Sequence, residues 1–115
     1  MLANMESLGL MQSAASGMDA QRAALDVFAR NVAAAEAAGP NGDYARLVPD
    51  FRVVDDGNGT SVEFTGSRTE PGKNVDIITE MIAVMNASRA YDSDASLFDV
   101  GKTLAERTID MGRMQ

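Results

Sequence analysis

The chain has 115 residues, the size of one domain or of one subunit in an assembly. Its formal net charge is −7, and its 17 acidic and 10 basic residues are scattered, which argues against a nucleic-acid partner and against an anionic membrane surface. The sequence contains neither cysteine nor histidine, which excludes disulfides and thiolate metal sites and removes the commonest general base. This composition favours assembly over catalysis.

The first strong helical signal runs from Met5 to about Ala38, and Gly39-Pro40 is expected to end it. No apolar run reaches the roughly 18 residues of a membrane-spanning helix, so we expect no membrane insertion. The first residues also differ from a secretory signal peptide, because they have no basic region and no compact apolar core. A stripe at heptad spacing marks one face of this helix: Leu8, Met11, Ala15, Met18, Arg22, Leu25, Ala29 and Val32.

The connecting segment, residues 40–73, has the composition of a β-hairpin. Tyr44–Val54 and Ser61–Thr65 are rich in β-branched and aromatic residues, and Asp55–Thr60 between them contains the Asp-Gly and Asn-Gly pairs that tight turns require. We expect the first strand to bend or bulge at Pro49. Because an isolated hairpin is marginally stable, it should lie on the helices, at their connected end, or on a neighbouring subunit.

The C-terminal segment, residues 74–115, predicts a second long helix, with Asn74 as its N-cap and Asp76 in its first turn. Its only internal glycine before Gly112 is Gly101. Apolar residues recur at three-then-four spacing: Val75, Ile78, Ile82, Met85, Tyr91, Ala95, Phe98, Ala105 and Ile109.

The two stripes match if the helices run antiparallel. The predicted fold is mainly α: two long antiparallel helices in a coiled-coil-like hairpin, residues 1–39 and 74–115, with a small β-hairpin between them. Gly17 would then face Gly101, which explains two mid-helix glycines that each cost about 1 kcal/mol relative to alanine; the alternative is that both lie on a solvent face. The predicted pairs are Leu8 with Ile109, Met18 with Phe98, Leu25 with Tyr91, and Val32 with Met85.

A lone pair of such helices would be marginally stable. Burying a large apolar side chain contributes about 1.5–3 kcal/mol, whereas fixing the backbone costs on the order of 1–2 kcal/mol per residue. Other subunits would bury the remaining apolar faces, with Ile77, Met81 and Val84 on one side and Leu104 and Met111 on another. The sequence therefore predicts a helical assembly.

Both ends of the chain resemble a known family. The N-terminal stretch Ser13–Ala33 is similar to the signature of bacterial flagellar rod and hook proteins, and the C-terminal half resembles the matching signature, most specifically in Asn86-Ala-Ser-Arg-Ala-Tyr91. Glu80-Met-Ile, Lys102-Thr-Leu and Ile109–Gly112 add to the match. The combination is nearest to the small proximal-rod (FlgC-type) members, and it covers about two-thirds of the chain.

The resemblance implies a structural subunit of the flagellar basal-body rod, the hollow shaft that crosses the periplasm and transmits torque. It implies export through the flagellar type III apparatus, and as partners further copies of itself, other rod subunits and membrane-ring or rod adaptor proteins. Two departures stand out: Ala34 replaces the family's usual second asparagine, and the middle segment is shortened to Thr69–Val75.

Arg89 and Tyr91 are the first candidates for contacts between subunits, because a guanidinium holds carboxylates or carbonyls and a tyrosine combines apolar area with a polar tip. The alternative for Arg89 is an intrahelical pair with Asp92, and the alternative for Arg22 is a pair with Asp26. The remaining interface candidates lie on both helices: Gln21, Arg22, Leu25, Asn31, Met85 and Phe98.

The sequence predicts no enzyme, cofactor or metal site. Asp55, Asp56 and Asn58, like Asp92 and Asp94, do not fit the calcium-loop pattern, and turn or surface chemistry explains them. No nucleophile–base pair stands out, so catalysis is a remote alternative. The nearer alternative is a helical adaptor or export chaperone that does not polymerise; it would be a compact folded oligomer in isolation.

Overall fold

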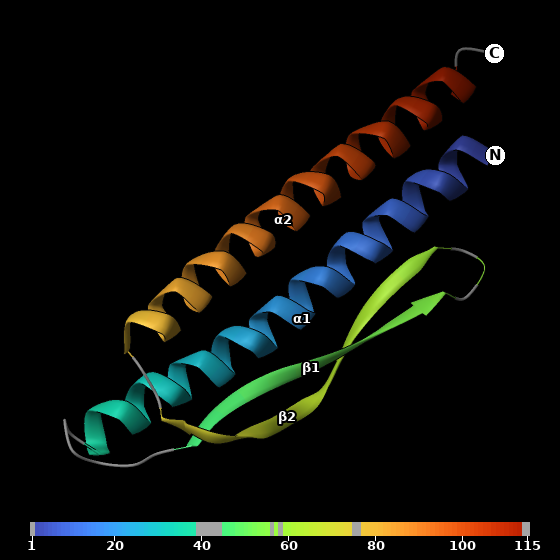
Figure 1. The fold of residues 1–115 in the computed structure, drawn as a ribbon. Helices are drawn as coiled ribbons and strands as arrows, with labels where there is room; N and C mark the ends of the chain where they lie inside the picture. Colours follow the sequence, from blue (N-terminus) through green and yellow to red (C-terminus); the bar gives the residue numbers. More distant parts are fainter. Residues whose placement is uncertain (1, 39–44, 56, 58, 75–76, 114–115) are drawn as a thin grey trace.

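The fold is a pair of long antiparallel helices with a β-hairpin lying along one of them (Figure 1). Helix α1 (Leu2–Ala38) and helix α2 (Ile77–Arg113) have 37 residues each. The molecule is elongated, with extents of 70 × 23 × 14 Å. The predicted mainly-α class is confirmed. The computed structural model describes residues 2–38, 45–55, 57, 59–74 and 77–113.

Strands β1 (Ala45–Asp55) and β2 (Thr60–Asn74) pair antiparallel and confirm the predicted hairpin. Gly57 in the turn has a φ of 86°, and its N–H donates to Asp55 Oδ1 at 3.1 Å, which is the local bond that favours such turns. A β-bulge interrupts the register, because Asp50 pairs with Gly66 while the next residue pairs with Phe64. The irregularity therefore lies beside Pro49, with the extra residue on β2.

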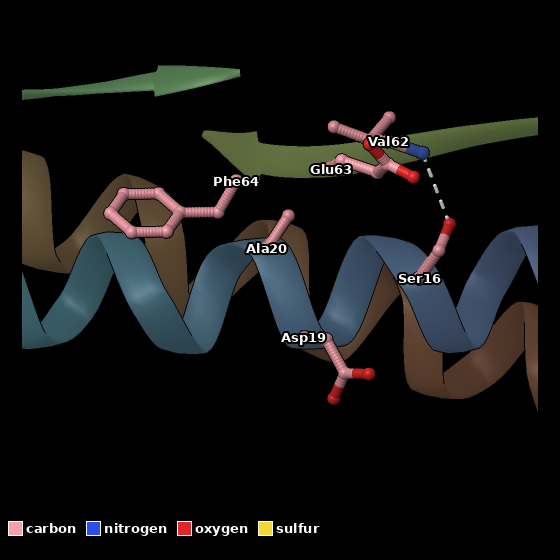
Figure 2. A pocket seen from close by; sticks show the side chains of 6 residues that line it. All are labelled: Ser16, Asp19, Ala20, Val62, Glu63 and Phe64. Carbon is pink, nitrogen blue, oxygen red and sulfur yellow. Dashed lines mark hydrogen bonds between the residues drawn. The ribbon is translucent and has the colours of Figure 1, made fainter. Parts of the chain in front are cut away.

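The hairpin lies on the helices as predicted, but it is not confined to their connected end, where the sequence placed it. It runs back along α1, so α1 lies between α2 and the hairpin in Figure 1. The tip is held by hydroxyls of α1: Val62 N–H donates to Ser16 Oγ at 3.2 Å, and Ser13 Oγ donates to the Thr60 carbonyl. Figure 2 shows Phe64 and Val62 close to Ala20, whose small side chain lets the strand approach the helix.

The helices meet through small residues rather than through the predicted large apolar stripe. The side of α2 that faces α1 repeats every seven residues, as in a coiled coil. The residues at this spacing are Glu80, Ala87, Asp94, Gly101 and Thr108. We define the small-residue seam as the buried small residues of this side: Ala87, Gly101 and Ala105. The stripe prediction is wrong at Ile78, Ile82, Met85 and Ile109, which are 68%, 54%, 56% and 48% exposed. It is also wrong at Leu8 on α1, the predicted partner of Ile109, which is 49% exposed.

The predicted register of the helices is also wrong. Gly17 faces Asp94 rather than Gly101, and Gly101 faces Ser7 and Met11. α2 is therefore displaced along α1 by about one to two helical turns from the predicted pairing. Both glycines do lie between the helices, because a Cβ on Gly101 would come within 2.8 Å of Met11 Cγ and one on Gly17 within 2.8 Å of Asp94 Cγ. The solvent-face alternative for them is excluded.

Asn74 does not cap α2. It belongs to β2 and pairs with Ala45, so this strand runs well past the predicted end at Thr65 and the helix begins at Ile77. A second irregularity precedes this pair, because Arg46 pairs with Glu70 while Ala45 pairs with Asn74. Several predictions concern residues outside the described ranges: the helix end at Gly39-Pro40, the strand start at Tyr44, the turn residues Asp56 and Asn58, and the helix residues Val75 and Asp76.

Candidate functional site

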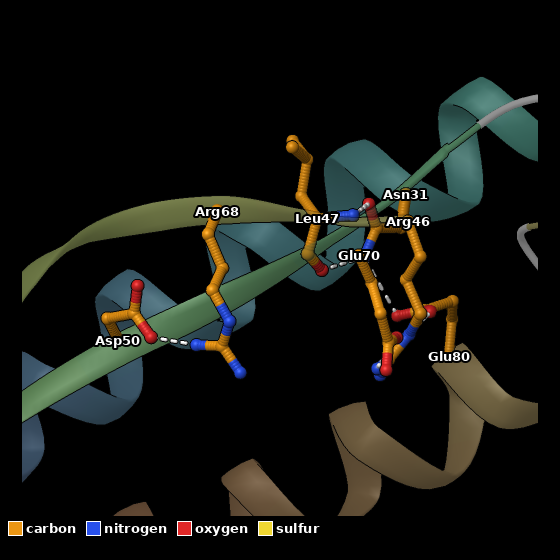
Figure 3. A network of polar contacts seen from close by, with 7 residues as sticks. All are labelled: Asn31, Arg46, Leu47, Asp50, Arg68, Glu70 and Glu80. Atoms are coloured by element: carbon orange, nitrogen blue, oxygen red, sulfur yellow. Dashed lines mark hydrogen bonds and ion pairs between the residues drawn. The ribbon is translucent and has the colours of Figure 1, made fainter. Parts of the chain in front are cut away.

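Asn31 joins α1 to the hairpin as a strand neighbour would. Its side chain is fully buried, and its Nδ2 donates to the Leu47 carbonyl at 2.8 Å while Leu47 N–H donates to its Oδ1 at 3.0 Å (Figure 3). One carboxamide thus satisfies both backbone groups of a residue in β1. The pair of bonds fixes both the distance and the register between α1 and β1.

Glu80, also fully buried, ties α2 into the same cluster. Its Oε2 accepts a hydrogen bond from Asn31 Nδ2 at 3.1 Å, and its Oε1 accepts one from Arg46 Nε. Arg46 Nη1 also lies 3.6 Å from Glu70 Oε2 on β2. The hydrogen bond that Arg46 donates to Glu80 raises the pKa of Arg46 above its ordinary value. We call Asn31, Arg46, Glu70 and Glu80 the polar clamp (Figure 3).

The polar clamp joins all four elements at one end of the molecule. A buried carboxylate is tolerated only where partners replace its lost hydration, and Glu80 has two. The clamp was not predicted from the sequence. One signal for it existed: Glu80 lies seven residues before Ala87 and fourteen before Asp94, so it shares the helix face that packs on α1.

The large apolar side chains at the start of α2 are exposed instead. We define the outer apolar face of α2 as Ile77, Ile78, Met81, Ile82 and Met85, which are between 41% and 68% exposed. These five residues fall within three turns of one helix, on the side away from α1. Contiguous exposed apolar surface of this kind is uncommon on monomers and marks sites of protein contact.

The interface candidates on α1 lie in three environments. Arg22 is exposed, and its Nη2 donates a hydrogen bond to Tyr91 Oη at 3.3 Å, which raises the pKa of Arg22. The alternative pair of Arg22 with Asp26 is absent among the described residues, where Asp26 instead pairs with Arg30 at 3.0 Å. Gln21 and Leu25 are half-buried. Gln21 borders a groove of about 320 Å³, whereas Leu25 packs against the Ala24, Phe28 and Ala87 cluster. Asn31 uses its side chain inside the chain, as described above.

The candidates on α2 are more accessible. Met85 belongs to the outer apolar face, Arg89 is exposed, and Tyr91 and Phe98 are half-buried. Within the described part of the chain, Arg89 forms no ion pair with Asp92. The structure brings Arg22 and Tyr91 together but does not gather the eight candidates into one site.

Two other kinds of feature are absent from the described residues. They contain no group of three or more acidic, histidine or cysteine side chains placed to hold a metal ion. Neither described helix has the combination of length and hydrophobicity needed to cross a membrane. The features with functional potential are therefore the polar clamp and the outer apolar face of α2.

The chain is similar to a known protein over nearly its whole length. The chain is 27% identical over 130 aligned residues to the flagellar basal-body rod protein FlgC of Aquifex aeolicus (strain VF5), and the alignment covers 92% of this chain and 97% of that protein. A search of protein-family models finds no match. The similarity spans nearly the whole of both chains and indicates a distant relationship to a flagellar rod protein.

Proposed function

We propose that this chain is a structural subunit of the bacterial flagellar basal-body rod, of the proximal-rod type. The observation that carries the proposal is the arrangement of α2, which uses small residues against α1 and exposes its Ile and Met side chains. Such a helix pair is suited to burying further apolar surface against other subunits. The end-to-end similarity to FlgC supports the rod as the kind of assembly.

The proposed mechanism is mechanical. Helices of neighbouring subunits would interlock through the outer apolar faces, where methionine adapts to neighbours that are not identical. The polar clamp would keep the hairpin rigid on the helix pair, so that each subunit passes on torque as one body. The proposed partners are copies of this chain, other rod subunits and membrane-ring or rod adaptor proteins. The proposed location is the periplasmic rod, reached through the flagellar type III apparatus.

Replacing Met85 with Asp tests the proposal. Because Met85 is 56% exposed, Met85→Asp should change the free energy of unfolding of the soluble chain by less than about 0.5 kcal/mol. It should nevertheless prevent incorporation into basal bodies and abolish swimming, because a charge would enter a packed interface. Ser93→Asp places the same charge at another exposed position of α2 and serves as the control.

The measurements are swimming of the complemented deletion strain and detection of the variant in purified basal bodies. Full incorporation of Met85→Asp would contradict the assembly mechanism. A wild-type chain that forms a compact closed oligomer in solution and never enters basal bodies would instead favour the adaptor or export-chaperone alternative.

A further inference from the structure

The outer apolar face of α2 continues into a charged residue. Ile78, Ile82, Met85 and Arg89 follow one another at intervals of four, three and four residues, so they form a single line along the helix. Arg89 is exposed and has no ion pair among the described residues. A surface that covers this line must therefore be apolar over about two turns and acidic at the end near Arg89.

Helix α1 carries a line of the same spacing on its own exposed side. Asp26, Arg30, Ala33 and Ala37 are all exposed, again at intervals of four, three and four residues. Around its alanines lies a shallow hollow of about 570 Å³, lined by Arg30, Ala33, Ala34, Ala37 and Ala38. Alanine side chains leave room for the bulky Ile and Met side chains of a partner helix.

We infer that the outer apolar face of α2 packs antiparallel onto this alanine face of α1 in a second copy of the chain. The inference rests on the proposed function and names the surfaces through which subunits would meet. In this alignment Ile78 meets Ala37, Ile82 meets Ala33 and Met85 lies against the aliphatic stem of Arg30. Arg89 then lies beside Asp26, whose carboxylate also pairs with Arg30 of its own copy at 3.0 Å, so the two guanidinium groups would share it.

The opposite helix direction gives a poorer match. It places the guanidinium of Arg89 against Ala37, where no carboxylate faces it, and it sets the carboxylate of Asp26 against Ile78. Burying a carboxylate against an apolar side chain without a partner is costly. Charge complementarity thus selects the antiparallel alignment.

The inferred contact joins two different faces, so it does not close a pair. After one contact, one copy still has a free α1 face and the other a free α2 face, so further copies can add head to tail into a ring or an open helical array. Because α1 and α2 are antiparallel both within a copy and across the contact, all copies point the same way. The array is therefore polar.

Engineered cysteines test the contact directly, because the chain has no cysteine of its own. The full chain carrying both Ala33→Cys and Ile82→Cys is concentrated, oxidised and run on a non-reducing gel. These positions lie on outward sides of different helices, so the expected product is a ladder of multimers rather than an internal disulfide. Ala33→Cys with Ser96→Cys, which moves the second cysteine four turns along α2, is the matched control and should give no ladder.

A charge exchange adds a second readout. Arg89→Glu should lower the ladder yield about fivefold, and adding Asp26→Arg should restore it, as expected for an exposed ion pair at its upper range. A ladder as strong in the control, a product that stops at dimers, or no ladder would overturn the inference. Incorporation of the wild-type chain into basal bodies is measured separately. If the chain is found in basal bodies but gives no ladder, only the inferred contact is contradicted. If the chain gives a ladder but is not found in basal bodies, only the proposed rod function is contradicted.

Discussion

Replacing Asn31 with alanine should detach the hairpin from the helices. The substitution removes three hydrogen bonds, of 2.8 and 3.0 Å to Leu47 and 3.1 Å to Glu80, from a side chain with no exposure to solvent. At about 1 kcal/mol for each bond, with a further cost for buried groups that lose their partner, the free energy of unfolding should fall by roughly 3–5 kcal/mol. Gln12→Ala, an exposed polar truncation on the same helix, should change it by less than about 0.5 kcal/mol.

Two assays separate the local effect from the global one. Urea unfolding followed by circular dichroism gives the loss of stability. Hydrogen exchange shows where protection is lost: amides of β1 and β2 should exchange much faster in Asn31→Ala, while those along the small-residue seam keep more of their protection. If Asn31→Ala unfolds like Gln12→Ala and the strand amides stay protected, the reasoning about the polar clamp is refuted.

Two further predictions concern the helix pair. Gly101→Ala should destabilise the chain by about 1–3 kcal/mol in urea unfolding, because the new Cβ meets Met11 Cγ at 2.8 Å and Ser7 O at 3.1 Å. Gly112→Ala is the control and should stabilise the chain by up to about 1 kcal/mol, because a Cβ there meets nothing within 4 Å. Equal effects of the two substitutions would contradict the close approach of the helices at Gly101. Burial raises the pKa of Asp94, so the folded chain holds this proton more tightly than the unfolded chain and stability declines as pH rises from about 4 through the raised pKa. Asp94→Asn should therefore be more stable than wild type at pH 7 and lose that advantage below about pH 4. The measurement is the melting temperature as a function of pH, with Asp99→Asn at an exposed position as the control. A profile of Asp94→Asn that runs parallel to wild type would contradict the predicted loss of stability as Asp94 ionises.

Helix and hairpin identity were predictable because they depend on local signals. Heptad-spaced apolar residues mark both helices, and Gly57 sits in the turn where an Asp-Gly pair predicts it. The register of the helices was not predictable in the same way. Periodicity reports which face of a helix is apolar, but not whether that face packs inside the chain or outside it, and here Ile82 and Met85 point outward while Ala87 and Gly101 face α1.

The polar clamp illustrates a second limit. Asn31 was singled out from the sequence as a candidate for contacts with other subunits, but nothing local indicates that its carboxamide pairs with Leu47, sixteen residues away. Its other partner, Glu80, is 49 residues distant, and its carboxylate is tolerated in a buried place because Asn31 and Arg46 each donate a hydrogen bond to it. Such contacts depend on how the hairpin docks, which is a tertiary property. The proposed contact roles of all eight interface candidates remain predictions: Gln21, Arg22, Leu25, Asn31, Met85, Arg89, Tyr91 and Phe98.

The most direct test of the rod proposal is electron microscopy of basal bodies from cells that lack this gene. The proposal predicts bodies that end at the membrane ring without a rod, in cells that do not swim, with both defects repaired when the gene is restored. Complete rods in the deletion strain would contradict the proposal, whether or not those cells swim.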